Sequence, residues 1–232
     1  MHIEILTEDS SGQRLLEYLV PKLIGPLGEP HTWRFHSYRG IGRIPANLSR
    51  TRDPSKRILL EQLPRLLRGY VTTPGIDAVV VVLDADDRDC ASFLGELQSV
   101  AATCGASHLT LFRLAIEEVE AWYLGDRSAL RLAYPNARVQ SLDGYVQDSV
   151  CGTWELLAEA IHPGGMRAIR QAGWPLPGQI KHDWAARIGP CLDPASNRSP
   201  SFGKLRDGIR RLASIPRPDQ PSPPTQPGPP GG

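Results

Sequence analysis

Residues 77–83, with the sequence DAVVVVL, constrain the fold more than any other segment of the chain. Consecutive β-branched residues favour an extended strand, and apolar residues at every position from Ala78 to Leu83 mean that both faces of the strand are buried. A half-exposed strand would instead alternate apolar and polar residues. The segment therefore predicts a central strand of a parallel sheet that helices cover on both faces.

Strand and helix patterns alternate along the first 125 residues. We expect strands at 2–7, 31–38, 77–83 and 107–114, and helices at 10–23, 55–67, 89–103 and 117–124. Ser10 or Ser11 is expected to cap the first helix and Ser55 the second, which Pro64 is expected to kink. This order predicts an α/β fold with a mainly parallel sheet and right-handed crossovers.

The chain divides into three parts by composition. Residues 1–133 form the predicted α/β core, and residues 134–214 form a mainly helical extension packed on that core. Residues 215–232 are a proline-rich tail that holds eight of the 22 prolines and has almost nothing to bury. We expect this tail to be disordered or polyproline-like, either as a solvated terminus or as an SH3-type ligand.

The overall charge and the cysteines exclude several classes of protein. A net charge of +1 excludes a histone-like polycation and gives no global argument for nucleic acid. No apolar run approaches the roughly 18 residues of a membrane helix, and the N-terminus is acidic where a signal peptide would be basic. We therefore expect a cytoplasmic protein without a membrane segment. The four cysteines are far apart, which predicts free thiols and no zinc cluster.

Acidic residues follow three of the predicted strands. Glu8 follows the first, Asp84 and Asp86 follow the third, and Glu117, Glu118 and Glu120 follow the fourth. Ligands of parallel sheets bind beyond the carboxyl ends of the strands, so these groups are expected to converge there. Such a cluster needs protonation or cations, and carboxylates without His or Cys partners suit Mg²⁺ or Mn²⁺.

Local structure offers an alternative for each acidic group. Asp87 or Asp89 can cap the following helix, and Glu118 can lie on a solvated face. On a regular helix Glu118 and Glu120 would point about 200° apart. If both bind metal, their segment must be extended or just entering the helix.

Three sequence blocks together resemble a known family. They are VVVVLDADDRDC, RLAIEEVEAWYLGD and NRSPSFGKLRDGIRRL, and the likeness extends over roughly residues 3–212. With the glutamate after the first strand, they resemble the TOPRIM domains of topoisomerases, primases and OLD-family nucleases. More closely, they resemble a TOPRIM-like family of unknown function that is often encoded beside an AAA-type or ABC-type ATPase in suspected anti-phage loci.

The resemblance implies a Rossmann-like sheet of TOPRIM type and assigns roles to particular residues. Glu8 would be a general acid or base or a metal ligand, and Asp84 and Asp86 would hold a divalent ion. Glu118 and Glu120 would help to hold a second ion. Lys181 would support the chemistry, with Lys204 as the alternative. Arg198, in the third block, would contact phosphate.

Basic residues are concentrated in two segments. Residues 34–57 carry seven positive charges against one negative charge, around the loop YRGIGRIP. The final block adds further basic residues. The predicted nucleic-acid contacts are Arg39, Arg43, Arg50, Arg52, Lys56, Arg57, Arg198 and Lys204. Such contacts would be to the backbone and dependent on salt; solubilising surface charge is the alternative.

The sequence thus predicts a nuclease that uses two Mg²⁺ or Mn²⁺ ions on DNA or RNA, as an effector that works with an ATPase. A catalytically weak module that binds and regulates the ATPase is a second interpretation. Association of the chain into a homo-oligomer is a further expectation. A nucleotide-sugar transferase that uses D-x-D is a third, but it leaves Glu8 and the EEVEAW block unused. A haloacid-dehalogenase phosphatase would need its D-x-D after the first strand.

Overall fold

One parallel sheet organises the chain, in the order β2-β1-β3-β4. The computed structural model describes residues 1–49, 53–172 and 176–214. The strands are β1 (His2–Thr7), β2 (Thr32–Ser37), β3 (Ala78–Asp84) and β4 (Thr110–Ala115). All three strand pairs are parallel, so the prediction of an α/β fold with a parallel sheet flanked by helices is confirmed. The proline-rich tail lies outside the described residues.

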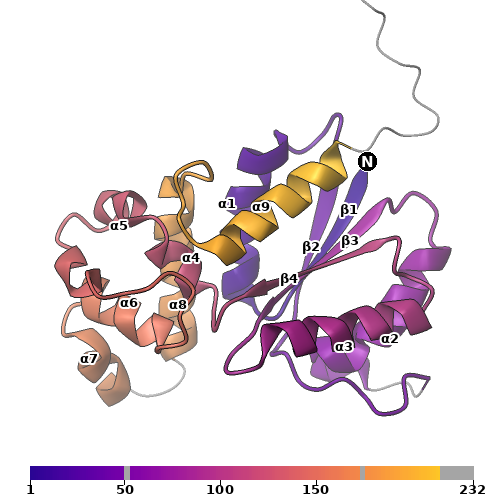
Figure 1. Cartoon of the computed structure of the whole chain (residues 1–232), viewed down its shortest axis with the longest axis horizontal. Helices are drawn as coiled ribbons and strands as arrows, with labels where there is room; N and C mark the ends of the chain where they lie inside the picture. The colour runs from indigo at the N-terminus through magenta and orange to yellow at the C-terminus, as the bar shows by residue number, and fades with distance from the viewer. Residues whose placement is uncertain (50–52, 173–175, 215–232) are drawn as a thin grey trace, which may run out of the picture.

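Helices cover both faces of the sheet (Figure 1). The first half of the chain contributes α1 (Ser10–Ile24), the short 3-10 helix η1 (Pro54–Lys56), α2 (Leu59–Thr72) and α3 (Cys90–Thr103). The second half contributes α4 (Glu120–Leu124), α5 (Arg127–Ala133), η2 (Val139–Leu142), α6 (Thr153–Ile161), α7 (Gly165–Ala172), α8 (Leu176–Ile188), η3 (Gly189–Cys191) and α9 (Pro200–Ala213). The second half is therefore mainly helical, as its sequence predicts.

The central strand β3 is buried on both faces, as its sequence predicts. Val80 and Val82 belong to one apolar core, which continues into α1, α9 and the other helices of the second half. Val79 and Val81 belong to a second core, which is closed by α2 and α3. Burial of apolar surface on both sides therefore fixes this strand in the middle layer.

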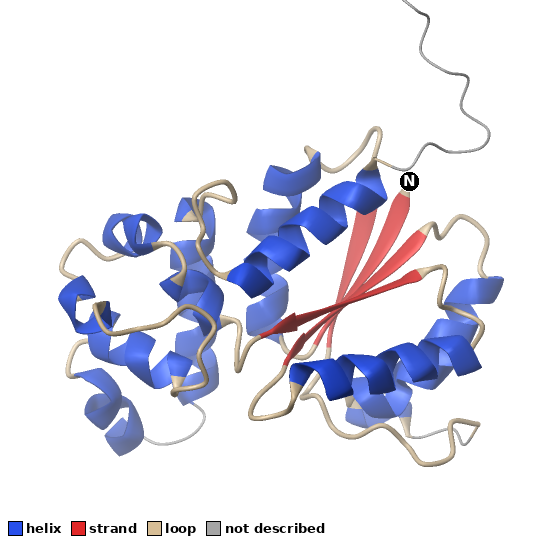
Figure 2. Ribbon diagram, in the orientation of Figure 1, coloured by secondary structure: helices blue, strands red, loops and turns tan. Residues whose placement is uncertain are grey.

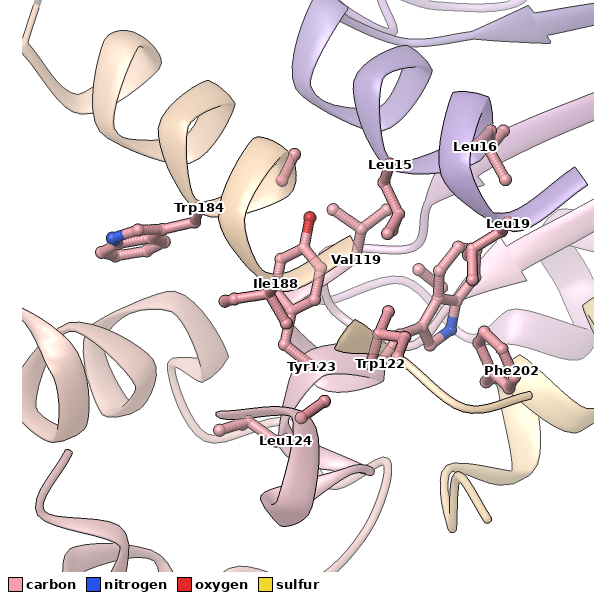
Figure 3. Packing of buried hydrophobic residues seen from close by; sticks show 14 of the residues in the cluster. Leu15, Leu16, Leu19, Val119, Trp122, Tyr123, Leu124, Trp184, Ile188 and Phe202 are labelled. Carbon is pink, nitrogen blue, oxygen red and sulfur yellow. The ribbon is translucent and has the colours of Figure 1, made fainter. Parts of the chain in front are cut away.

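Helices α4 to α8 gather beyond the arrowheads of the strands, whereas α9 returns to the sheet (Figure 2). Helix α9 packs against β4 and α1. Trp122, at the start of the helical part, packs edge-to-face on Phe202 of α9, with ring centroids 6.0 Å apart (Figure 3). The boundary at residue 133 stays a prediction.

Two predicted helix caps are wrong. Asp9, rather than Ser10 or Ser11, caps α1: its carboxylate accepts a hydrogen bond of 2.8 Å from the amide of Gly12. Helix α2 begins only at Leu59 without a side-chain cap. Ser55 lies in η1, where Asp53 accepts its amide hydrogen bond, because an Asx turn satisfies that amide locally.

Two negative expectations concern membranes and cysteines. Among the described helices, none has the length and apolar character that crossing a bilayer requires. All four cysteines are free thiols, as expected.

Candidate active site

The acidic residues predicted after the strands meet at the carboxyl edge of three neighbouring strands. Glu8 follows β1, Asp84 ends β3, and Asp86 lies two residues later. Glu118 precedes α4 and Glu120 is its first residue, beyond the end of β4. Because β1, β3 and β4 are adjacent in the sheet, their ends bring these groups together, and each changes the pKa of at least one other.

The backbone beside Asp86 is strained. Asp86 and Glu117 both adopt left-handed conformations, with φ of 51° and 59°. The amide of Asp86 donates a hydrogen bond of 2.8 Å to the carbonyl of Glu117, so the two residues form an isolated antiparallel bridge. Such conformations cost about 1–3 kcal/mol per non-glycine residue and are concentrated at functional sites. The bridge holds the D-x-D segment against the segment that carries Glu118 and Glu120.

Glu118 and Glu120 can bind one metal ion only if their segment is extended or just entering a helix, and the structure meets this condition. Helix α4 begins at Glu120, and Glu118 lies in the turn before it. Asp84 stabilises this start, because its Oδ1 accepts a hydrogen bond of 3.1 Å from the amide of Val119. The two glutamates therefore approach one position: Lys181 lies within salt-bridge distance of both.

Lys181 supplies a positive charge within the carboxylate group. Its Nζ lies 2.8 Å from Glu118 Oε1 and 3.7 Å from Glu120 Oε2, and 5.4 Å from the centre of the Trp154 ring. Burial alone would lower the pKa of Lys181, but the charges of Glu120, Glu118 and Asp84 raise it above its ordinary value. Lys181 therefore stays protonated and neutralises part of the acidic charge.

Bound protons neutralise a further part of the acidic charge. Burial, reinforced by the charges of Asp86 and Asp9, raises the pKa of Glu8 to about 7. Burial also raises the pKa of Glu120 to about 7 against the opposing charge of Lys181. The pKa of Asp84 lies well above its ordinary value because the group is buried and faces Glu8 and Glu120. Repulsion among the carboxylates is thus reduced in two ways, by the ammonium of Lys181 and by bound protons.

Several carboxylate oxygens in this group are buried and have no hydrogen-bond partner among the residues that the structure describes. They are Glu8 Oε2, Glu118 Oε2 and both oxygens of Glu120. Buried polar atoms are normally satisfied, so these oxygens point to a ligand that donates protons or positive charge. Hard oxygens fit Mg²⁺ or Mn²⁺. As they stand, however, no three Asp, Glu, His or Cys side chains in the described part of the chain are arranged to hold an ion.

Carboxylate oxygens without hydrogen-bond partners are compatible with the lack of an ion-binding arrangement if the ammonium of Lys181 occupies the position of an ion. The carboxylates that would share an ion are instead drawn to Lys181 Nζ. The donor chemistry fits a divalent cation, and binding one requires the side chains of Glu118 and Lys181 to rearrange.

Comparison with known proteins adds no relative. No family model, curated protein or solved structure matches this chain. The resemblance to TOPRIM domains therefore rests on the residues themselves.

Glu117 has a structural role. Its carboxylate accepts hydrogen bonds of 2.8–3.2 Å from the amides of Cys151, Gly152 and Thr153. These amides open α6, where a carboxylate also favours the helix dipole. Asp89 is likewise structural, since it caps α3 by accepting the amide hydrogen bond of Ser92 at 2.8 Å.

The first basic segment is attached to the acidic edge through its backbone. The amide of Gly40 donates a hydrogen bond of 3.0 Å to the carbonyl of Glu8, and the amide of Arg39 donates one of 2.7 Å to the carbonyl of Arg57. The side chains of Arg39, Arg43, Lys56 and Arg57 are exposed. Arg50 and Arg52 lie outside the described residues.

The second basic segment lies on the surface near α9. Arg198 is exposed, while its amide donates a hydrogen bond of 2.9 Å to the carbonyl of Gly125. Lys204 is exposed on α9, where its charge opposes the rise that burial causes in the pKa of the Cys90 thiol. Of the two candidate lysines, the structure brings Lys181 to the carboxylates.

Sequence reasoning missed two members of the site. Asp9, besides capping α1, adds negative charge that raises the pKa of Glu8, Asp84 and Glu120. Tyr123 is fully buried, and its hydroxyl has no hydrogen-bond partner within the described structure (Figure 3). Asp9 could have been predicted as a member of the site because it directly follows Glu8. Nothing in the sequence distinguishes Tyr123 from an ordinary core tyrosine.

Proposed function

We propose that this chain is a divalent-metal-dependent nuclease that hydrolyses phosphodiester bonds of DNA or RNA. One observation carries the proposal: at the carboxyl edge of the parallel sheet, Glu8, Glu118 and Glu120 hold buried carboxylate oxygens that have no hydrogen-bond partner among the described residues. Lys181 lies within ion-pair distance of Glu118 and Glu120. Edges of this kind are where ligands of parallel sheets bind. The likeness of the three sequence blocks to TOPRIM domains supports the same reading.

The residues would divide the work as follows. Glu8, Asp84, Asp86, Glu118 and Glu120 would hold one or two Mg²⁺ or Mn²⁺ ions. Bound ions of this kind activate water and stabilise the attacking and leaving oxygens of a phosphodiester. Glu8, with a pKa of about 7, is suited to accept or donate a proton near neutral pH. Lys181, once released by Glu118, would stabilise the negative charge that develops on the phosphate.

The polyanion would be held by the basic loop. Arg39, Arg43, Lys56 and Arg57 are exposed on the segment that is hydrogen-bonded to Glu8. Contacts from these residues to the phosphate backbone would be independent of base sequence and would weaken with salt.

The test is cleavage of single-stranded and double-stranded DNA and RNA by the purified chain with Mn²⁺. We expect cleavage by the natural chain and none by the double variant D84N/D86N. The matched control is D87N, which removes an exposed charge from the same loop. Unchanged cleavage by D84N/D86N would refute the proposal, as would failure of every substrate with Mn²⁺ and the candidate ATPase present.

A second function is favoured by the position of Lys181. Its ammonium already neutralises Glu118 and Glu120, which would suit a catalytically weak module that regulates an ATPase. Titration of the chain with Mn²⁺, followed by electron paramagnetic resonance, separates the two. Binding that is lost in D84N/D86N supports the nuclease, whereas no binding together with complex formation supports the module.

The partner and the setting are further proposals. By resemblance, the chain would act in anti-phage defence with an ATPase encoded nearby. Co-purification of the two chains tests this, and an isolated chain that never associates with that ATPase would contradict it.

A further inference from the structure

Trp154 lies beside the lysine of the acidic group. It is the second residue of α6, and its ring packs only partly against the apolar core, whereas Trp122 and Trp184 are 0% and 2% exposed within that core. Lys181 Nζ is 5.4 Å from the centre of the Trp154 ring. An aromatic face attracts a cation within about 6 Å, so the indole stabilises the ammonium at this position.

Three side chains define where the ammonium of Lys181 lies. Its Nζ is 2.8 Å from Glu118 Oε1 and 3.7 Å from Glu120 Oε2, and the Trp154 ring is the third contact. A lysine side chain is flexible and ends in a compact point charge, so contacts on more than one side are needed to hold it in one place. Because this side chain is only 18% exposed, water screens the attractions little.

Hydrogen bonds to Glu117 fix the start of α6, and with it Trp154. The carboxylate of Glu117 accepts hydrogen bonds of 2.8–3.2 Å from the amides of residues 151–153, directly before Trp154 in the chain. The carbonyl of Glu117 accepts a further hydrogen bond of 2.8 Å from the amide of Asp86. One residue therefore joins the D-x-D segment to the first turn of α6, which gives the indole a defined position relative to the carboxylates.

The ammonium of Lys181 and a divalent ion would compete for the same oxygens. Glu118 and Glu120 are among the residues that would hold an ion, and both lie within ion-pair distance of Lys181 Nζ. The apparent affinity for an ion falls with the fraction of chains in which these carboxylates are free. A contact that stabilises the ammonium here therefore weakens binding of the ion.

We propose that Trp154 is a positioning residue for Lys181: it holds the ammonium against Glu118 and Glu120 in the metal-free chain. The indole thereby sets how strongly a divalent ion must compete for these carboxylates. The inference rests on the proposed function, because that function assigns the two glutamates to the metal. It adds a residue of α6 whose effect passes entirely through the lysine.

The experiment is titration of the full chain with Mn²⁺, followed by electron paramagnetic resonance. Trp154→Leu should bind Mn²⁺ about threefold more tightly than the natural chain, because one cation–π contact no longer holds the ammonium. Trp154→Phe keeps an aromatic face and should bind nearly as the natural chain does. Damage to the fold would weaken binding, so the expected increase has the opposite sign to a merely structural effect.

The matched control is Trp33→Leu. Trp33 is also a partly buried tryptophan at the margin of the same core, but it lies near the start of β2, away from the carboxyl ends of the strands. Its replacement removes the same amount of side chain and should leave the affinity for Mn²⁺ unaltered. A gain in Trp33→Leu equal to that in Trp154→Leu would contradict a specific role of Trp154.

Two further measurements show whether Trp154 acts through Lys181. In a Lys181→Met background, Trp154→Leu should have no additional effect on Mn²⁺ affinity, because the ammonium is already absent. In the natural chain, Mg²⁺ should change the tryptophan fluorescence as the ammonium leaves the indole, and Trp154→Phe should lose that change. The fluorescence measurement needs no Lys181 variant, so it decides the point even if Lys181→Met does not fold.

Failure of this inference is distinguishable from failure of the proposed function. If the natural chain binds Mn²⁺ and Trp154→Leu binds it equally or more weakly, the positioning role is wrong whatever the chain cleaves. If Trp154→Leu binds more tightly but no nucleic acid is cleaved, the positioning role stands and the nuclease proposal falls. Absence of Mn²⁺ binding in every variant would refute the positioning role together with the metal site.

Discussion

Two buried glutamates, one within the sheet and one beyond its carboxyl edge, have opposite surroundings. Glu4, within β1, is 5% exposed, and each of its oxygens pairs with a histidine: His36 Nε2 at 2.5 Å and His2 Nε2 at 3.2 Å. Glu120, at the carboxyl edge, is 1% exposed, and neither of its oxygens has a hydrogen-bond partner within the described residues. A satisfied buried acid is part of the scaffold, whereas an unsatisfied one indicates a site for a ligand.

Removal of Lys181 should produce the largest effect on stability. In Lys181→Met the charges of Glu118 and Glu120 lose their cation, which costs about 3–5 kcal/mol for a buried pair. Urea denaturation at pH 8 measures the loss. The triple variant K181M/E118Q/E120Q should recover most of it. A loss below about 1 kcal/mol would mean that these carboxyls are already neutral at that pH.

Replacement of Glu4 should destabilise the chain without changing its affinity for Mn²⁺. Glu4→Gln leaves one histidine with a poor partner, for a cost of about 1–3 kcal/mol in the free energy of unfolding. Mn²⁺ affinity should stay as in the natural chain, since Glu4 lies away from the strand ends. A weaker Mn²⁺ affinity in Glu4→Gln would contradict the purely structural role of Glu4.

The stability of the chain should depend on pH through the carboxyl groups of Glu8 and Glu120. Glu8 and Glu120 have pKa values raised from 4.5 to about 7, so the folded chain holds their protons more tightly than the unfolded chain. Stability from these groups is therefore fully present below pH 4.5 and is lost as the pH rises towards about 7. The combined loss is about 1–3 kcal/mol for coupled, partly screened groups.

Denaturation in urea between pH 4.5 and pH 8, without metal, measures this loss. Glu120→Gln should flatten the profile of stability against pH, because it removes one of the two carboxyl groups whose pKa is raised. If stability falls with pH as steeply in Glu120→Gln as in the natural chain, the Glu120 carboxyl does not titrate between pH 4.5 and pH 8.

Asp86 should have the smallest effect on stability. Its side chain is 47% exposed, and its ion pair with Arg88 is long, at 3.5 Å. Asn tolerates the left-handed backbone at this position, so Asp86→Asn should change the free energy of unfolding by less than about 0.5 kcal/mol. Mn²⁺ affinity should nevertheless fall at least about tenfold, which electron paramagnetic resonance measures. Undiminished affinity would exclude Asp86 as a ligand.

The sequence predicts the sheet well because the hydrophobic pattern of each strand can be recognised from neighbouring residues alone. The run of valines in β3 and the acidic residues after β1, β3 and β4 are readable without tertiary information. The gathering of Glu8, Asp84 and Glu120 follows from the parallel order of the strands. Two of the cap assignments fail because neighbouring aspartates, Asp9 and Asp53, form stronger local hydrogen bonds than the serines.

The rest of the site depends on contacts between distant segments. Lys181 reaches Glu118 across 63 positions of the chain, and Glu117 caps a helix 35 positions later. No local pattern encodes such contacts. Likewise, packing decides that the carboxylate oxygens of Glu120 have no hydrogen-bond partner among the described residues, and sequence periodicity does not describe such packing.

The position of Lys181 in α8 has a consequence for synthesis of the chain. Glu8, Asp84 and Glu120 leave the ribosome well before the lysine that neutralises them, and α9, which covers β4 and α1, follows later still. Until both helices have been made, the nascent sheet carries an acidic edge without its cation and an apolar face without its cover. Assembly of the site is therefore a late event in biogenesis, in which the most distant contacts form last.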